Sequence, residues 1–120
     1  MAGIVGPDEV RADPSLAILD EINALRRLHD LAPVCLEPRL TVEARAHARD
    51  MARHDYLVTH LPNGDKFETR LKRAGYTDKR MFVQLVAGFF NPRGVVARWA
   101  SQKATRRPLL DKRFADVGLG

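Results

Sequence analysis

Residues 41–60 read TVEARAHARDMARHDYLVTH, and their spacing predicts an amphipathic helix that delivers a histidine, His60, to one end. Small and apolar side chains recur along this stretch at helical spacing: Leu40, Ala44, Ala48 and Met51. Charged side chains occupy its other faces, and Pro38 suits its first turn. We therefore expect a helix over about residues 38–57 with one face on the core.

Two further histidines lie within this helix. His47 and His54 are seven residues apart, so their Cα atoms would be separated by roughly 10 Å. That distance is too large for both to bind one metal ion unless their side chains converge. We expect His47 to pack against the core and His54 to be solvated.

Length and composition indicate a soluble globular chain. With 120 residues, of which 45% are hydrophobic and 29% charged, we expect a flexible tail over residues 1–12 and a single domain over residues 13–120. No apolar run approaches the ~18 residues of a membrane span, and no signal peptide is recognised. Cys35 cannot form an internal disulfide, and between Val34 and Leu36 we expect it to be buried.

The remaining pattern predicts the α+β class. Helices are expected over about residues 13–30, 38–57, 66–74 and 91–102, and extended segments at 34–36, 81–90 and 114–120. Four helices, short strands and no βαβ repeat favour layered α+β packing.

The formal net charge of +5 is concentrated near the C-terminus. Residues 98–113 contain one acidic residue, Asp111, and six cationic residues: Arg98, Lys103, Arg106, Arg107, Lys112 and Arg113. We expect a basic loop after the fourth helix, with Lys103, Arg106 and Arg107 as candidate anion-binding residues. Such a loop could bind a polyanion such as nucleic acid, lipid headgroups or an anionic envelope polymer. The alternative is a solvated surface loop.

Five stretches, in order, resemble the CAP (SCP-like) superfamily of cysteine-rich secretory proteins, antigen 5 and plant pathogenesis-related proteins, particularly its short bacterial members. They are INALRRLHDLAPVCLEPRL, VEARAHARDMARHDYLVTH, LPNGDKFETRLKRAGY, NPRGVVARW and FADVGLG. The resemblance implies a CAP-like α-β-α sandwich with a small antiparallel sheet and a central cleft. It also implies an extracellular or cell-envelope location.

In this family two histidines and two glutamates line the cleft, and in several members they bind a divalent metal. His60 matches the first family histidine, Val83 and Gln84 match a glutamate and its neighbouring asparagine, and Thr105 matches the second histidine. The resemblance therefore implies a cleft formed by His60, Gln84 and Thr105. One imidazole with an amide and a hydroxyl is a poor zinc site, so we expect no metal and no cofactor.

Three functions follow from these observations. The first is a non-catalytic binding module that holds a protein or a small-molecule or lipid ligand in the cleft. The second is a hydrolase or metal-binding protein with His60 as general base and Ser101, Thr105 or Cys35 as nucleophile. The third is binding of an anionic polymer by the basic loop. No residue is assigned as catalytic.

Family members continue beyond the stretch that matches FADVGLG into a closing antiparallel strand. A sheet without that strand exposes an edge. If the chain naturally ends there, we expect self-association into a homo-oligomer through this edge.

Overall fold

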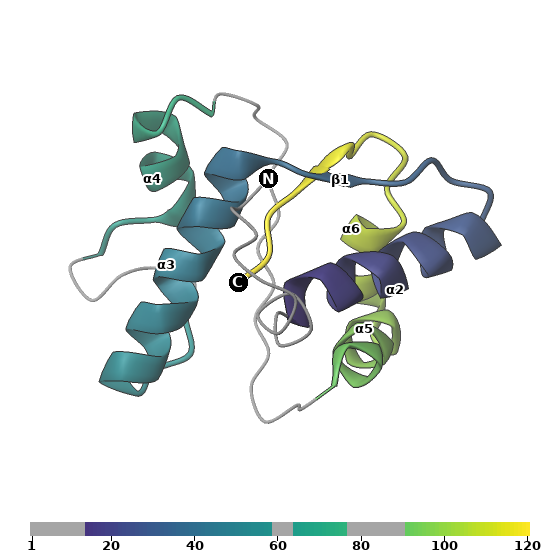
Figure 1. Cartoon of the computed structure of the whole chain (residues 1–120), viewed down its shortest axis with the longest axis horizontal. Helices are drawn as coiled ribbons and strands as arrows, with labels where there is room; N and C mark the ends of the chain where they lie inside the picture. The colour runs from purple at the N-terminus through teal and green to yellow at the C-terminus, as the bar shows by residue number, and fades with distance from the viewer. Residues whose placement is uncertain (1–13, 59–63, 77–90) are drawn as a thin grey trace, which may run out of the picture.

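The computed structural model describes residues 14–58, 64–76 and 91–120 (Figure 1). These residues form five helices and two strands: α2 (Pro14–Leu28), β1 (Cys35–Leu36), α3 (Pro38–His54), α4 (Phe67–Arg73), α5 (Pro92–Ala100), α6 (Lys103–Leu109) and β2 (Asp116–Val117). The expected tail over residues 1–12 and the expected extended segment over residues 81–90 lie outside the described residues. Among the helices of the described part, none is long and apolar enough to span a bilayer.

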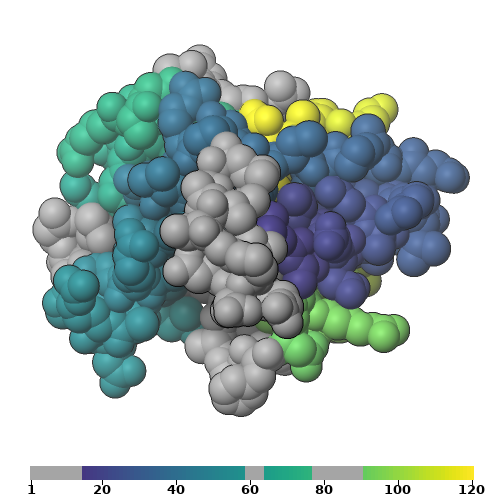
Figure 2. Space-filling view, in the orientation of Figure 1, coloured from purple at the N-terminus to yellow at the C-terminus, as the bar shows by residue number. Residues whose placement is uncertain are grey.

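The helices form two layers with the strands between them. The helices α3 and α4 lie on one side, and α2, α5 and α6 lie on the other (Figure 1). The two strands bridge the layers at one edge, where the C-terminal segment is visible beside β1 and the start of α3 (Figure 2). The expected α+β class is confirmed.

Two helices, α3 and α5, begin with the same N-cap arrangement. The side chain of Glu37 accepts a hydrogen bond from Leu40 N at 2.9 Å, and that of Asn91 accepts one from Gly94 N at 2.6 Å. In each case a proline follows the capping residue, at the first helical position where no backbone N–H is required. These caps explain why both predicted helix starts are correct.

The two described strands pair in parallel, not antiparallel as expected. Cys35 pairs with Asp116 and Leu36 with Val117. Backbone bonds of 2.9 Å run from Cys35 N to Ala115 O and from Glu37 N to Val117 O. Parallel pairing is possible because a long connection containing four helices separates the strands and returns the chain to the same end of the sheet.

Two further expectations were wrong. Cys35 is exposed, because side chains alternate along a strand and its neighbour Val34 takes the buried face. The expected basic loop begins with the helix α6. Its arginines, lysine, alanine and leucine are good helix formers, and Pro108 and Leu109 in its last turn are buried.

The C-terminal segment packs directly on the backbone of α3. A Cβ atom on Gly118 would lie 2.2 Å from the carbonyl carbon of Leu40, and one on Gly120 would lie 2.4 Å from that of Ala44. Leu119, between the two glycines, is buried in the core. Two residues of extended chain and four residues of helix both span about 6 Å, so the glycines match successive turns of α3.

We expect Gly118→Ala to lower the free energy of unfolding by about 1–3 kcal/mol, because the added methyl group must push the segment off α3. Urea denaturation would measure this loss. Ala46→Ser, which adds one atom on the exposed face of the same helix, is the control and should be close to neutral. Equal midpoints for the Gly118 variant and the wild type would contradict the observed close approach.

Candidate functional site

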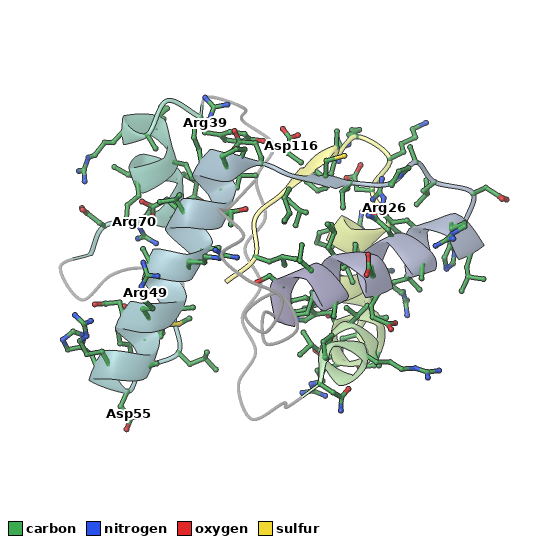
Figure 3. The ribbon with its side chains drawn as sticks, viewed as in Figure 1. Arg26, Arg39, Arg49, Asp55, Arg70 and Asp116 are labelled. Carbon is green, nitrogen blue, oxygen red and sulfur yellow. The ribbon has the colours of Figure 1, made fainter. Side chains whose placement is uncertain are left out.

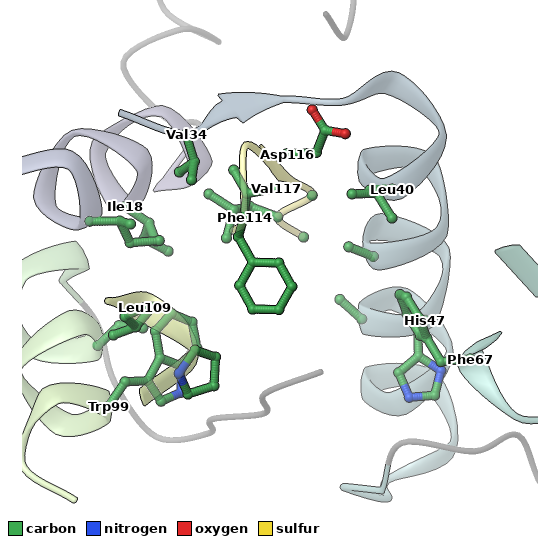
Figure 4. A pocket seen from close by; sticks show the side chains of 18 of the residues that line it. Ile18, Val34, Leu40, His47, Phe67, Trp99, Leu109, Phe114, Asp116 and Val117 are labelled. Carbon is green, nitrogen blue, oxygen red and sulfur yellow. The ribbon is translucent and has the colours of Figure 1, made fainter. Parts of the chain in front are cut away.

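The described side chains line a cavity of about 770 Å³ between the two helical layers. We call it the interlayer cavity (Figure 4). The face of α3 predicted from the sequence to be apolar forms one wall. Residues lining the cavity include Ile18, Ile22, Val34, Leu40, Ala44, His47, Ala48, Met51, Trp99, Leu109, Phe114 and Leu119.

Trp99 contributes a polar atom to this apolar surface. Its indole ring lies within the space between the layers (Figure 4). Its Nε1 atom is buried and has no hydrogen-bond partner among the described residues. An indole N–H can only donate, and a buried donor without an acceptor costs free energy. Trp99 therefore places an unsatisfied buried donor beside the cavity that its ring lines.

His47 lies at the α3 wall with only 3% of its surface exposed. Its Nε2 is 2.6 Å from the carbonyl oxygen of Val58, and its Nδ1 is 3.2 Å from Nη2 of Arg70. A carbonyl can only accept and a guanidinium can only donate, so Nε2 carries the proton and Nδ1 is the acceptor. The expectation that His47 packs is confirmed, and both of its nitrogens have partners.

Arg70 joins α4 to α3 through several contacts. Its Nε donates to Glu43 at 3.0 Å, its Nη1 donates to the carbonyl of Asp65 at 2.8 Å, and its guanidinium lies 5.2 Å from the ring centroid of Phe67. Only 8% of Arg70 is exposed, so this ion pair is largely shielded from water. His47, Arg70 and Glu43 together form what we call the α3–α4 network (Arg70 is labelled in Figure 3).

A second polar group lies at the C-terminal end of α3. The hydroxyl of Tyr56 donates to the carboxylate of Asp50, which also pairs with Nδ1 of His54 at 3.2 Å. The hydrogen bond from Tyr56 lowers the pKa of Asp50, and the same bond raises the pKa of Tyr56. His54 is exposed, as expected.

Of the residues predicted to form the cleft, His60 and Gln84 lie outside the described residues. Thr105 is half-buried, and its hydroxyl donates to the carbonyls of Trp99, at 2.5 Å, and Gln102, at 3.3 Å. It is not among the described residues that line the interlayer cavity. A joint cleft of these three residues stays a prediction.

Of the three proposed nucleophiles, Ser101 and Thr105 lie at the junction of α5 and α6, and Cys35 lies on β1. Ser101 donates its hydroxyl to the carbonyl of Arg98 at 2.7 Å, and Cys35 is exposed on β1. Within the described ranges, no group of three or more histidine, cysteine or acidic side chains could hold a metal ion.

Lys103, Arg106 and Arg107, the predicted anion-binding residues, all lie on α6 and are exposed. Sequence reasoning did not identify Arg70, Glu43 or the Trp99 donor. Arg70 follows Glu43 by 27 residues, and nothing local indicates that they meet. Nothing in the sequence around Trp99 indicates that its N–H lacks a partner among the described residues.

The sequence matches the family model described as "CAP: Cysteine-rich secretory protein family" over residues 19–120. The chain therefore belongs to the CAP, or cysteine-rich secretory protein, family.

Individual relatives agree with this assignment. The chain is 27% identical over 104 residues to the uncharacterized protein YkwD of Bacillus subtilis strain 168. The matched region covers 86% of this chain and 40% of YkwD. It matches a crystal structure of an extracellular protein containing an SCP domain from Bacillus anthracis Ames with a TM-score of 0.83 and 21% identity, over 99% of this chain and 41% of the other.

An outer surface protein from Borrelia burgdorferi matches with a TM-score of 0.74 and 17% identity, over 98% of this chain and 84% of the other. The expected CAP-like fold is thus confirmed. The chain spans about two fifths of the length of YkwD and of the Bacillus anthracis protein.

We expect His47→Phe to destabilise the protein by about 1–3 kcal/mol, because the ring is retained while the Val58 carbonyl and one Arg70 donor lose their partner. The free energy of unfolding from urea denaturation would test this. His54→Phe is the control: His54 is exposed and its Nδ1 contacts the carboxylate and the carbonyl oxygen of Asp50 at the surface, so its loss should cost at most about 1 kcal/mol. Similar losses in both variants would contradict the structural role assigned to His47.

The Tyr56–Asp50 bond predicts a pH dependence. Because the folded pKa of Asp50 is lowered, its contribution to stability is present above the ordinary aspartate pKa of about 4 and is lost as the pH falls through the folded value. The raised pKa of Tyr56 acts oppositely, so that contribution is lost in strong alkali. Tyr56→Phe should therefore be less stable than the wild type at neutral pH, and the difference should shrink on acidification.

Thermal unfolding of both proteins across the acid range would measure that difference. Asp50→Asn should reproduce the effect, and the double variant should add little to either single variant. A gap between wild type and Tyr56→Phe that is constant at every pH would rule out this coupling.

Proposed function

We propose that this domain is a non-catalytic binding module that acts outside the cell or in the cell envelope, and that its interlayer cavity holds an apolar, lipid-class small molecule. The observation that carries the proposal is an apolar cavity lined by Trp99, whose buried Nε1 donor has no partner among the described residues.

The size and chemistry of the cavity support this class of ligand. A volume of about 770 Å³ is typical of small-molecule sites, which range over roughly 300–1,000 Å³. Aliphatic and aromatic side chains from both layers form most of its described wall. A long hydrocarbon with one carbonyl or carboxyl oxygen would satisfy that wall and the Trp99 donor together.

The polar groups near the cavity favour binding over catalysis. Both nitrogens of His47 have partners, and the carboxylate of Asp50 is held by Tyr56 and His54. A general base needs a nitrogen or oxygen that can take a proton from a reacting group. These side chains are already committed to the packing of α3.

The names of two structural relatives support the location. One is described as an extracellular protein and the other as an outer surface protein. This placement agrees with the location implied by the family resemblance.

Trp99 is the only tryptophan in the chain, so intrinsic fluorescence reports directly on the cavity. We expect titration with a long-chain fatty acid such as palmitate to give a saturable shift in the Trp99 emission. Ala48→Leu, which fills the cavity, should weaken binding at least about tenfold, since it displaces about three buried methylene groups of ligand. The matched control Ala46→Leu places the same side chain on the exposed face of α3 and should bind like the wild type.

Calorimetry on Trp99→Phe would test the donor, because loss of one hydrogen bond should weaken fatty-acid binding. Titrations with hexadecanol and with methyl palmitate would show which oxygen of the ligand is required. Circular dichroism would verify that each variant is folded. An emission spectrum unchanged at saturating fatty acid, or equal binding by both alanine variants, would show that the cavity does not take this ligand class.

A further inference from the structure

The exposed side of α6 is a row of positive charge. Lys103 lies three residues before Arg106 and four before Arg107, so the three side chains share one face of the helix. All three are exposed, whereas Pro108 and Leu109 face the core. We call Lys103, Arg106 and Arg107 the basic face.

No acid neutralises this face within the described residues. Arg106 donates to the carbonyl of Ala100 at 3.2 Å, and Lys103 and Arg107 have no side-chain partner there. Asp111 is the one acid between residues 92 and 113, and Arg113 binds both of its oxygens, at 2.7 and 3.0 Å. The charge of the basic face therefore remains available to a partner.

This arrangement carries a cost for the isolated helix. Like charges at three- and four-residue spacing destabilise a helix. The two arginines in the last turn recover part of that through the helix dipole, but Lys103 stands at the first position, where a cation is unfavourable. An anionic partner would remove the repulsion.

The neighbouring end of α5 extends the positive surface. Because Arg106 reaches the carbonyl of Ala100, its guanidinium lies at the C-terminal end of α5. Arg98, two residues earlier, is also exposed. Arg98 is thus a further exposed cation on the helix that Arg106 contacts.

The surroundings of the basic face indicate the kind of polyanion. The large exposed hydrophobic residues of the described part are Leu28, Val42, Leu57 and Val58, and none belongs to α5 or α6. A membrane-binding helix normally inserts apolar side chains, and a single-strand nucleic-acid site normally stacks bases on aromatic ones. Trp99, the aromatic residue of α5, lines the cavity instead.

We propose that the basic face binds a flexible, phosphate-bearing polymer of the cell envelope through charge alone. This site is separate from the interlayer cavity, since none of its three residues lines that cavity. It shares with the proposed function only the location outside the cell, and fatty-acid binding can fail without affecting it.

Inorganic polyphosphate is the probe, and calorimetry at several salt concentrations is the measurement. Each phosphate contact on a flexible chain lowers the logarithm of the affinity by about 0.7 per tenfold rise in salt, so three contacts predict a slope near −2. The affinity should then fall about 16-fold for a fourfold rise in salt.

The triple variant Lys103→Gln, Arg106→Gln and Arg107→Gln should lose at least about tenfold in affinity at low salt and most of the slope. The control is Arg49→Gln, Arg53→Gln and Lys72→Gln, which removes the same charge from exposed positions of α3 and α4 in the other layer (Arg49 is labelled in Figure 3). It should retain most of the affinity.

Equal losses in the two triple variants would overturn the proposal, because net charge and not the basic face would then govern binding. Salt-independent binding would also overturn it. Tighter binding to single-stranded DNA, or to vesicles containing anionic lipid, than to polyphosphate of equal charge would replace the envelope polymer by a nucleic acid or a membrane.

Discussion

The buried guanidinium of Arg26 is the interaction on which the fold depends most. Only 1% of this residue is exposed, and it donates to the carbonyls of Ala32, Leu109, Asp111 and Phe114 over 2.7–3.3 Å (Figure 3). A buried cation is tolerated only when its donors are satisfied, and here backbone oxygens provide nearly the whole set. One α2 side chain thereby fixes the segment that leads into β1 and the connection from α6 to β2. These are the two chain segments that must meet to form the parallel pair.

The parallel pair in turn determines how the two layers are spaced. Once Leu36 is in register with Val117, the next residues of the C-terminal segment run along α3, where Gly118 and Gly120 approach its backbone. Any larger side chain at these positions would push the C-terminal segment away from α3. Leu119 lies in that segment, so this core residue would move as well. The width of the interlayer cavity is therefore a consequence of backbone contact on one wall. A wall made only of side chains could rearrange. The C-terminal segment lies against the backbone of α3 and has little freedom to do so.

The sequence predicted what is encoded locally. The start of α3 at Pro38, the start of α5 near Asn91 and the apolar face of α3 each involve neighbouring residues, and each was predicted correctly. The errors concern distant partners. The parallel pairing joins Cys35 to Asp116 across most of the chain, and α6 depends on a core that receives Pro108 and Leu109. For the site, burial of His47 followed from its position on α3, whereas its partner Arg70 lies 23 residues further on. Local pattern predicted a layered α+β fold, and the resemblance to the CAP family supplied the specific α-β-α sandwich.

The distribution of polar partners separates two kinds of recognition in this domain. The α3–α4 network and the Tyr56–Asp50 pair satisfy one another's polar groups along α3. The cavity wall therefore offers mainly shape and apolar surface, with Trp99 as the one side-chain donor lacking a partner on that wall in the described residues. On α6 the situation is reversed, because charge is exposed without neutralisation and apolar surface faces inward. Binding in the cavity should therefore respond weakly to salt, while binding on the basic face should respond strongly. The basic face and the interlayer cavity use different side chains. A substitution that alters binding at one of these sites can therefore leave binding at the other unchanged.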